Sequence, residues 1–184
     1  RSSGSRVLAW MDYGDWAGTY LQARGFELLT DVVTYSKFDQ SLPPSAVADV
    51  RMVAASDKDI PAIVAIDRTA FAPYWWQSED TVRRRAAASA HFHVARVGGG
   101  SGGYAEGELR LPIAHLNRIA VIPSYQGRGV GAALLREALC CFWEQEAEWV
   151  TLNTQAHNRS SQRLYQRFGF EATGDSVAVW ELRI

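Results

Sequence analysis

The most informative stretch of the chain reads Arg118-Ile119-Ala120-Val121-Ile122-Pro123-Ser124-Tyr125-Gln126-Gly127-Arg128-Gly129-Val130-Gly131-Ala132. It begins as an apolar strand, turns at a proline, and continues as a glycine-rich segment that opens a long amphipathic helix. The first N–H groups of a helix have no partner within the helix, and they carry partial positive charge. Glycine has no Cβ, so the backbone can approach an anion closely. The stretch therefore predicts a binding site for a phosphate or pyrophosphate.

Two common phosphate-binding motifs do not fit this stretch. No Gly-Lys-Ser/Thr follows, which excludes a Walker loop. The spacing G-x-G-x-G, placed after several strands, also differs from the dinucleotide fingerprint. Arg128 can add charge-assisted contacts to an anion. A plain glycine-rich turn is the alternative interpretation, and the preceding strand and following helix favour the phosphate site.

The sequence on both sides alternates between strand and helix patterns. Alternating apolar residues predict strands, and apolar residues three or four apart predict helices. The expected strands lie at residues 50–53, 91–97, 104–111, 116–122, 149–152 and 176–182. The expected helices begin near residue 60 and cover residues 81–88, 130–143 and 160–168. The glycine-rich segment 98–103 is expected to be a turn. This interleaving predicts a mixed α/β or α+β layer.

A second element lies downstream, at Asn158-Arg159-Ser160-Ser161-Gln162-Arg163-Leu164-Tyr165-Gln166-Arg167-Phe168-Gly169-Phe170. With the first stretch, it makes residues 50–184 resemble the GNAT superfamily of acetyl-CoA-dependent N-acetyltransferases. The family's signature, Gln/Arg-x-x-Gly-x-Gly/Ala, is matched in full by residues 126–131. The second element is similar to the family's pattern of Asn, a small residue, Leu-Tyr and Gly-Phe.

The resemblance implies a fold and a cosubstrate. The fold is a twisted, mostly antiparallel sheet with helices on both faces, whose central strands splay apart to admit acetyl-CoA. Ile119, Ala120 and Val121 would offer backbone groups to the pantetheine arm, like an added strand. Asn158 would also bond that arm. The pyrophosphate would lie on the loop and the first helical turn, at Gln126, Gly127, Arg128, Gly129, Val130, Gly131 and Ala132.

Acetyl transfer to an amine also needs a general acid and a general base. The resemblance places Tyr165 near the sulfur, where a phenol of pKa about 10 keeps its proton at neutral pH and can donate it to the leaving thiolate. The base is open. His115 heads the central strand, where some family members carry a catalytic glutamate. Asn153 stands where others carry a glutamate, and an amide cannot act as a base.

The acceptor site has several candidate residues. Trp75 and Trp76 belong to an aromatic cluster between two expected helices, and either can form a wall for an apolar or cationic acceptor. Core packing is the alternative for both. Glu106 shares a strand face with Glu108. The pair are further candidates for the general base, and Glu106 is also a candidate for the acceptor site. A solvated strand face is the alternative. The run 83–85 of three arginines is expected to cover a solvated helix face.

The first residues of the chain repeat the last ones. At an offset of 144, Gly-Phe-Glu at 25–27 falls on Gly-Phe-Glu at 169–171, and both segments read as strand, loop, helix, turn and strand. We interpret residues 1–38 as the terminal fragment of a degenerate upstream GNAT-like domain, followed by a linker at 39–49 and a GNAT domain at 50–184. The first copy has Gly14 and Leu21 in place of Asn158 and Tyr165, so it is expected to bind no cofactor. The parent protein would then be a tandem protein.

Composition limits the classes of partner. Of the 184 residues, 47% are hydrophobic and 21% charged, so the chain can bury a core. A formal net charge of −1 gives no reason to expect nucleic acid or an anionic membrane. The only cysteines, Cys140 and Cys141, predict buried thiols, no metal site and a reducing, cytoplasmic location.

The sequence thus predicts an enzyme that acetylates a primary amine of a small molecule or peptide, with a homodimer possible. A non-catalytic, acetyl-CoA-binding regulatory module is the alternative. The presence of Tyr165 favours the enzyme, because a binder needs no proton donor at the sulfur.

Overall fold

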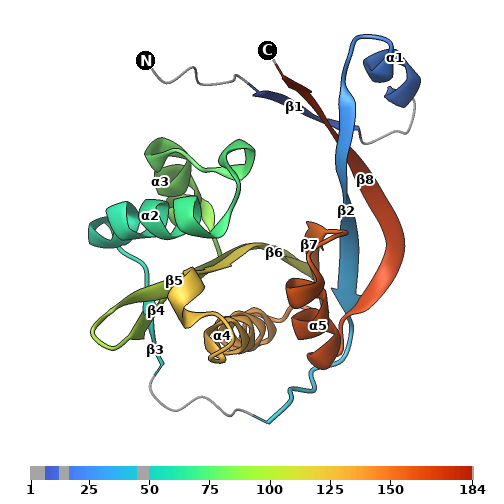
Figure 1. The fold of residues 1–184 in the computed structure, drawn as a ribbon. Coiled ribbons are helices and arrows are strands. Elements are labelled where there is room, and N and C mark those ends of the chain that lie inside the picture. The colour runs from blue at the N-terminus through green and yellow to red at the C-terminus, as the bar shows by residue number, and fades with distance from the viewer. Residues whose placement is uncertain (1–6, 13–16, 45–49, 184) are drawn as a thin grey trace.

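The computed structural model describes residues 7–12, 17–44 and 50–183. Within these residues one eight-stranded sheet runs through the molecule in the order β1-β8-β2-β7-β6-β5-β4-β3 (Figure 1). The strands are β1 (Val7–Asp12), β2 (Glu27–Lys37), β3 (Arg51–Ala54), β4 (His91–Val97), β5 (Gly100–Arg110), β6 (Ile113–Val121), β7 (Trp149–Gln155) and β8 (Glu171–Arg183).

Five α-helices and three short 3-10 helices connect these strands in the described part of the chain. The α-helices are α1 (Gly18–Gln22), α2 (Ile60–Ala70), α3 (Glu79–Ala88), α4 (Val130–Glu144) and α5 (Arg159–Arg167). The 3-10 helices are η1 (Asp57–Asp59), η2 (Pro73–Trp75) and η3 (Pro123–Tyr125). No helix among the described residues has both the length and the apolar character needed to cross a membrane.

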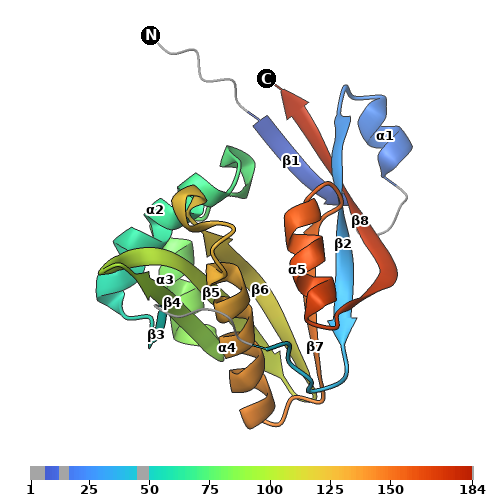
Figure 2. The same cartoon turned by 60° about the horizontal axis from the view of Figure 1, so that its bottom comes forward.

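Helices cover both faces of the sheet (Figure 2). One core lies under α2 and α3 and includes Ile63 and Val82. The other lies under α4 and α5 and includes Leu135 and Tyr165. All neighbouring strands are antiparallel except β6 and β7. The structure therefore confirms the expected twisted, mostly antiparallel sheet between two helical layers.

The central strands β6 and β7 separate along their length. Their parallel pairing runs from Ile113 opposite Trp149 to Leu116 opposite Leu152 and stops there. Beyond Leu116, β6 keeps its partner β5 but has no strand on its other side. The gap opens toward the carboxyl end of β6, beside the start of α4 and α5, and it positions the candidate site described below.

The amino-terminal strands are part of the same sheet. β2 lies between β7 and β8 and pairs with both, and β1 pairs with the far side of β8. Figure 1 shows β2 as the long blue strand beside the red β8. β8 has no pairing with β7, so β2 provides the only backbone link between them in the described sheet. Residues 27–37 and 50–183 therefore do not form separate sheets.

One expected turn is largely strand. Only Gly98 and Gly99 form the turn, and β5 already begins at Gly100. The glycines inside β5 serve close packing rather than chain reversal. A Cβ on Gly103 would lie 2.5 Å from the Ala120 carbonyl oxygen, and one on Gly107 would lie 2.6 Å from that of His115.

Candidate active site

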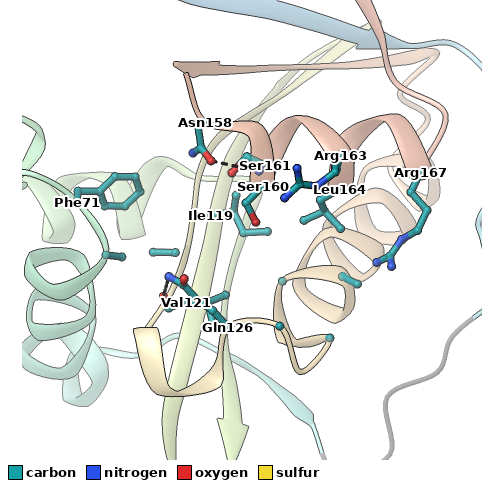
Figure 3. A pocket seen from close by; sticks show the side chains of 16 residues that line it. Phe71, Ile119, Val121, Gln126, Asn158, Ser160, Ser161, Arg163, Leu164 and Arg167 are labelled. Carbon is teal, nitrogen blue, oxygen red and sulfur yellow. Dashed lines mark hydrogen bonds between the residues drawn. The ribbon is translucent and has the colours of Figure 1, made fainter. Parts of the chain in front are cut away.

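A cavity of about 600 Å³ lies at the gap beside β6 (Figure 3). Side chains from α5 and from the loop before α4 face one another across it. It brings together nine of the predicted cosubstrate residues, namely Ile119, Ala120, Val121, Gln126, Gly127, Gly129, Gly131, Ala132 and Asn158. The fold thus brings these distant segments together at one cavity, and their contacts with a ligand stay predictions.

The glycine-rich loop adopts the backbone conformation that its glycines permit. Gly127 and Gly129 have φ angles of 72° and 84°, and Gly129 is the N-cap of α4. The Gln126 side-chain amide donates a hydrogen bond to the Val121 carbonyl oxygen at 3.0 Å, which ties the loop to the end of β6. Two predicted cosubstrate residues do not line the cavity. Val130 is buried in the core under α4, and the Arg128 guanidinium lies beside the Tyr125 ring.

Helix α5 forms the opposite wall. Asn158 is its N-cap, and its side-chain oxygen accepts a hydrogen bond from the Ser161 backbone N–H at 3.2 Å. This contact uses the amide oxygen and leaves the amide nitrogen as the group that can donate to a ligand. Arg163 and Arg167 lie one helical turn apart and also line the cavity. They add positive charge opposite the amino end of α4.

A second cavity, of about 370 Å³, adjoins the first. Phe71, Ile119, Asn158 and Ser161 line both. The second cavity alone is bordered by Trp75, His115, Asn153 and Tyr165, and also by Met11 of β1 and Val32 of β2. We call it the acceptor cavity. A group held at the shared residues would face both Tyr165 and His115.

Tyr165 is buried, with 3% of its surface exposed. Its ring packs near Phe170 and Tyr35, with centroids 6.0 Å and 6.2 Å away. Burial raises the pKa of Tyr165 to about 12. The phenol therefore keeps its proton throughout the neutral and mildly alkaline range, which a proton donor requires.

His115 is held in a defined orientation by Thr151. Its Nδ1 lies 2.7 Å from the Thr151 hydroxyl oxygen, and that hydroxyl donates to the Ala114 carbonyl oxygen at 3.3 Å. A hydroxyl has one proton, so Thr151 is left to accept a hydrogen bond from Nδ1–H, and Nε2 carries the free lone pair. Burial lowers the pKa of His115 from 6.5, against an opposite effect of Glu108 and Glu106. The imidazole is therefore neutral at pH 7.

An ionic cluster fixes the aromatic loop to β6. The Arg118 Nε donates to the buried Asp67 carboxylate at 2.6 Å, and its Nη2 donates to the Trp75 carbonyl oxygen at 2.6 Å. Asp67 also accepts from the Tyr104 hydroxyl at 2.7 Å and from the Gln77 N–H at 3.0 Å. The Arg118 guanidinium stacks 3.9 Å from the Phe71 ring centroid. These contacts hold the loop of η2 at the rim of both cavities.

The two predicted tryptophans differ in position. Trp75 lines the acceptor cavity, as a wall residue should. Trp76 is 45% exposed, and its indole N–H donates to the Phe71 carbonyl oxygen at 2.8 Å. Trp76 is not among the residues that line the acceptor cavity.

Glu106 is buried and does not line the acceptor cavity. Its carboxylate accepts from Arg85 at 2.9 Å, from the Ser89 hydroxyl at 2.7 Å and from the Asn117 amide at 2.9 Å. Arg85 therefore differs from the solvated role expected for the 83–85 run, because the fold brings α3 over β5. No cluster of metal-ligating side chains occurs among the residues that the structure describes.

Most of the residues that line the two cavities lie within one segment that matches a known family. Residues 88–172 match the family model described as an acetyltransferase (GNAT) domain. The chain contains a GNAT acetyltransferase domain. Acyl transfer is thus the enzymatic class of this domain.

Known proteins similar to this chain are also acetyltransferases by name. A Bacillus subtilis (strain 168) protein, named as an alanine N-acetyltransferase of ribosomal protein bS18, is 26% identical over 130 residues, covering 71% of this chain and 83% of its own. The structure of a GCN5-related N-acetyltransferase from Sphaerobacter thermophilus has a TM-score of 0.74 at 16% identity, with 100% of this chain and 61% of that chain covered. A tandem GNAT protein from the clavulanic acid biosynthesis pathway has a TM-score of 0.64 at 12% identity, with 97% and 64% covered. The chain thus spans about three fifths of these two structural neighbours, and at such identities they establish the fold alone.

Sequence reasoning missed several residues at the GNAT cavities. Arg163 and Arg167 belong to the second motif, and their spacing of four already placed them on one helix face. Thr151 and Asp67 gave no signal, since each acts through a residue distant in sequence. Met11 also gave none, because its cavity is formed only when β1 joins the sheet.

Proposed function

We propose that this GNAT domain transfers an acetyl group from acetyl-CoA to a primary amine by direct attack. The observation that carries the proposal is the meeting of the two cavities. One is bordered by the glycine-rich amino end of α4, and the other contains His115 and Tyr165. The thioester would lie at the residues that both cavities share. Release of free CoA thiol, measured across a panel of primary amines, tests the activity. CoA binding without turnover of any amine would instead favour a regulatory module.

The cosubstrate would lie along the first cavity. Its pyrophosphate would be held by backbone N–H groups from Gly127 to Ala132, and its phosphates would also meet Arg163 and Arg167. The β7-facing side of β6 beyond Leu116 has no strand partner, so its backbone groups can pair with the pantetheine arm. The Asn158 amide nitrogen would donate to the same arm.

The chemical step would use His115 and Tyr165. A protonated alkylamine is not a nucleophile, so Nε2 of His115 would remove one proton, directly or through water. The neutral amine nitrogen forms a bond to the thioester carbon, and the C–S bond breaks. Tyr165 would donate its proton to the departing sulfur. Asn153 lines the cavity but has no basic atom.

We expect Gly129→Val to weaken binding of CoA by about ten-fold or more, or about 1.4 kcal/mol. The valine side chain would stand where the pyrophosphate approaches the N-cap of α4. The substitution also strains a φ of 84°. Gly99→Val is a matched control, because Gly99 has the same φ and no atom within 4 Å of its Cβ position. Calorimetric titration should give one site per chain and an affinity loss only for the Gly129 variant. An equal affinity in both variants would place the phosphate elsewhere.

We expect His115→Gln to lower kcat/KM by about 10²-fold, the lower part of the range for general base catalysis. The pKa of His115 lies below 6.5, and the unprotonated form is the active one. The rate of the unaltered protein should therefore be level above pH 6.5 and fall as the pH drops through the lowered pKa. The variant should lose this acidic limb. A variant that keeps both the rate and the limb would exclude His115 as the base.

We also propose that β1-α1-β2 is a degenerate copy of β7-α5-β8. The order β1-β8-β2-β7 supports this. If β1 is exchanged with β7 and β2 with β8, the result is the same order read from the other side, so the two copies occupy equivalent positions in the sheet. Both copies contribute their last strand to the centre of this group. Residues 1–38 would then derive from an upstream domain whose cofactor site is lost.

A further inference from the structure

The amino-terminal segment contributes to the acceptor cavity. Met11 of β1 and Val32 of β2 line it together with residues of β6, β7 and α5. β1 also contacts η2, the 3-10 helix that contains Trp75. Figure 1 shows β1 beside β8, at the edge of the sheet. The first copy, which has no predicted role in catalysis, thus forms one wall of the acceptor cavity.

We propose that Met11, together with Trp75, restricts the acceptor to a small amine that has one amino group and no second cationic group. The inference rests on the proposed function, since it assigns the substrate class of the same cavity. Two independent properties of the cavity support it, namely its size and the charges around it.

The size of the cavity favours a small acceptor over a peptide. A sphere of 370 Å³ is about 9 Å across, whereas four extended residues span about 13 Å. The volume lies near the small end of the range of about 300–1,000 Å³ for small-molecule sites. A peptide whose terminal amine reached His115 would have to continue past the wall formed by β1 and η2. A molecule of amino-sugar or amino-alcohol size would fit without displacing either.

The charges around the cavity disfavour a second cation. Among the described residues that line it there is no aspartate or glutamate, whereas Arg85 and Arg118 are present. Two carboxylates that bind residues of the cavity lining already accept several hydrogen bonds. Glu106 accepts three side-chain hydrogen bonds, and Asp67 accepts from Arg118, Tyr104 and the Gln77 N–H. A desolvated ammonium without a counter-ion is costly.

The same environment suits the reacting amine. Burial away from carboxylates disfavours the charged form of an amine and lowers its pKa. The acceptor nitrogen therefore loses its proton more readily in this cavity than in water. A neutral imidazole such as His115 is then a sufficient base, and a stronger carboxylate network is not required.

Binding of bisubstrate conjugates tests the inference without turnover. The sulfur of CoA is joined through an acetyl bridge to 4-amino-1-butanol, to 1,4-diaminobutane, or to the amino terminus of a tetra-alanine amide. Calorimetry with the full chain should show the aminobutanol conjugate binding about ten-fold or more tightly than CoA, and the other two at least about ten-fold more weakly than the aminobutanol conjugate. A tetra-alanine conjugate that binds as tightly as the aminobutanol conjugate would overturn the size limit. An equally tight diaminobutane conjugate would overturn the charge limit.

A substitution in β1 identifies the wall. Met11→Gly should open the cavity and raise the affinity of the tetra-alanine conjugate by about ten-fold, with the affinity for CoA unchanged. Trp10→Ala is the matched control, because Trp10 precedes Met11 on β1, is 52% exposed and does not line the cavity. It should alter neither affinity. If the affinity for the tetra-alanine conjugate is unchanged in the Met11 variant, Met11 does not limit the size of the acceptor. Failure of CoA itself to bind would instead contradict the proposed function, and the inference with it.

Discussion

Replacing Tyr165 by phenylalanine should leave CoA binding intact and slow turnover by about ten-fold or more, toward the range of about 10²–10⁴ for a general acid. The substitution removes the hydroxyl proton that Tyr165 would donate to the departing sulfur. Burial raises the pKa of Tyr165 to about 12, so the phenol remains a donor at all pH values at which the protein would be assayed. The activity of the unaltered protein should therefore show no alkaline fall from this group below about pH 10.

Tyr35→Phe is the matched control for this experiment. Tyr35 is 5% exposed, and its ring centroid is 6.2 Å from that of Tyr165, but it does not line the acceptor cavity. Both variants lose one hydroxyl from the same core, so the loss of packing is comparable. Steady-state rates and melting temperatures should separate them, with only the Tyr165 variant slow. Equal rates in the two variants would remove Tyr165 from the mechanism.

Deleting residues 1–45 should leave a chain that is unfolded or self-associated at 25 °C. β8 pairs only with β1 and β2, so the deletion removes every strand neighbour that β8 has in the described sheet. The deletion also removes Tyr35, whose ring packs near that of Tyr165, and Val32, which lines the acceptor cavity. Burial of these two side chains is worth about 1.5–3 kcal/mol each. Their loss alone is a large part of the about 5–15 kcal/mol that stabilises a typical domain.

Circular dichroism melting and sedimentation velocity would measure this effect. The exposed edges of β7 and β8 should pair with another chain, so a folded product is expected to be a dimer or larger. A synthetic peptide of residues 26–38 should restore part of the melting temperature, because it carries β2 and both its pairing edges. A deleted chain that melts at the original temperature as a monomer would contradict the strand order described above.

Local physical chemistry made the cosubstrate loop and its helix predictable. Glycines at 127 and 129 adopt positive φ angles, and apolar residues at helical spacing give α4 one buried face. The same holds for α5, where Asn158 caps the helix within three residues of sequence. These contacts lie within a few residues along the chain, so the sequence alone carries them. The expected helix of 130–143 ends at Glu144 in the structure.

The 98–103 segment shows where composition misleads. Glycine clusters usually mark turns, and Ser101 is the only non-glycine among residues 100–103, so strand alternation could not be detected there. The structure uses Gly103 where the β6 backbone and Leu134 leave no room for a Cβ. That requirement comes from a strand and a helix located further along the chain.

The sequence by itself determined the family, the loop that would bind the pyrophosphate, and Tyr165 and His115 as candidates for acid and base. Only the tertiary structure decided that Thr151 orients His115, that Arg118 and Asp67 hold the η2 loop, and that Met11 borders the acceptor cavity. The reason lies in the pairing of strands. The alternation of side chains along a strand shows which of them share a face of the sheet. The backbone hydrogen-bonding groups of a strand, however, can pair with any other strand, so the sequence of one strand does not specify its neighbour. Tertiary packing between distant segments therefore determines that β2 lies between β7 and β8. The same packing determines which residues form the wall of the acceptor cavity.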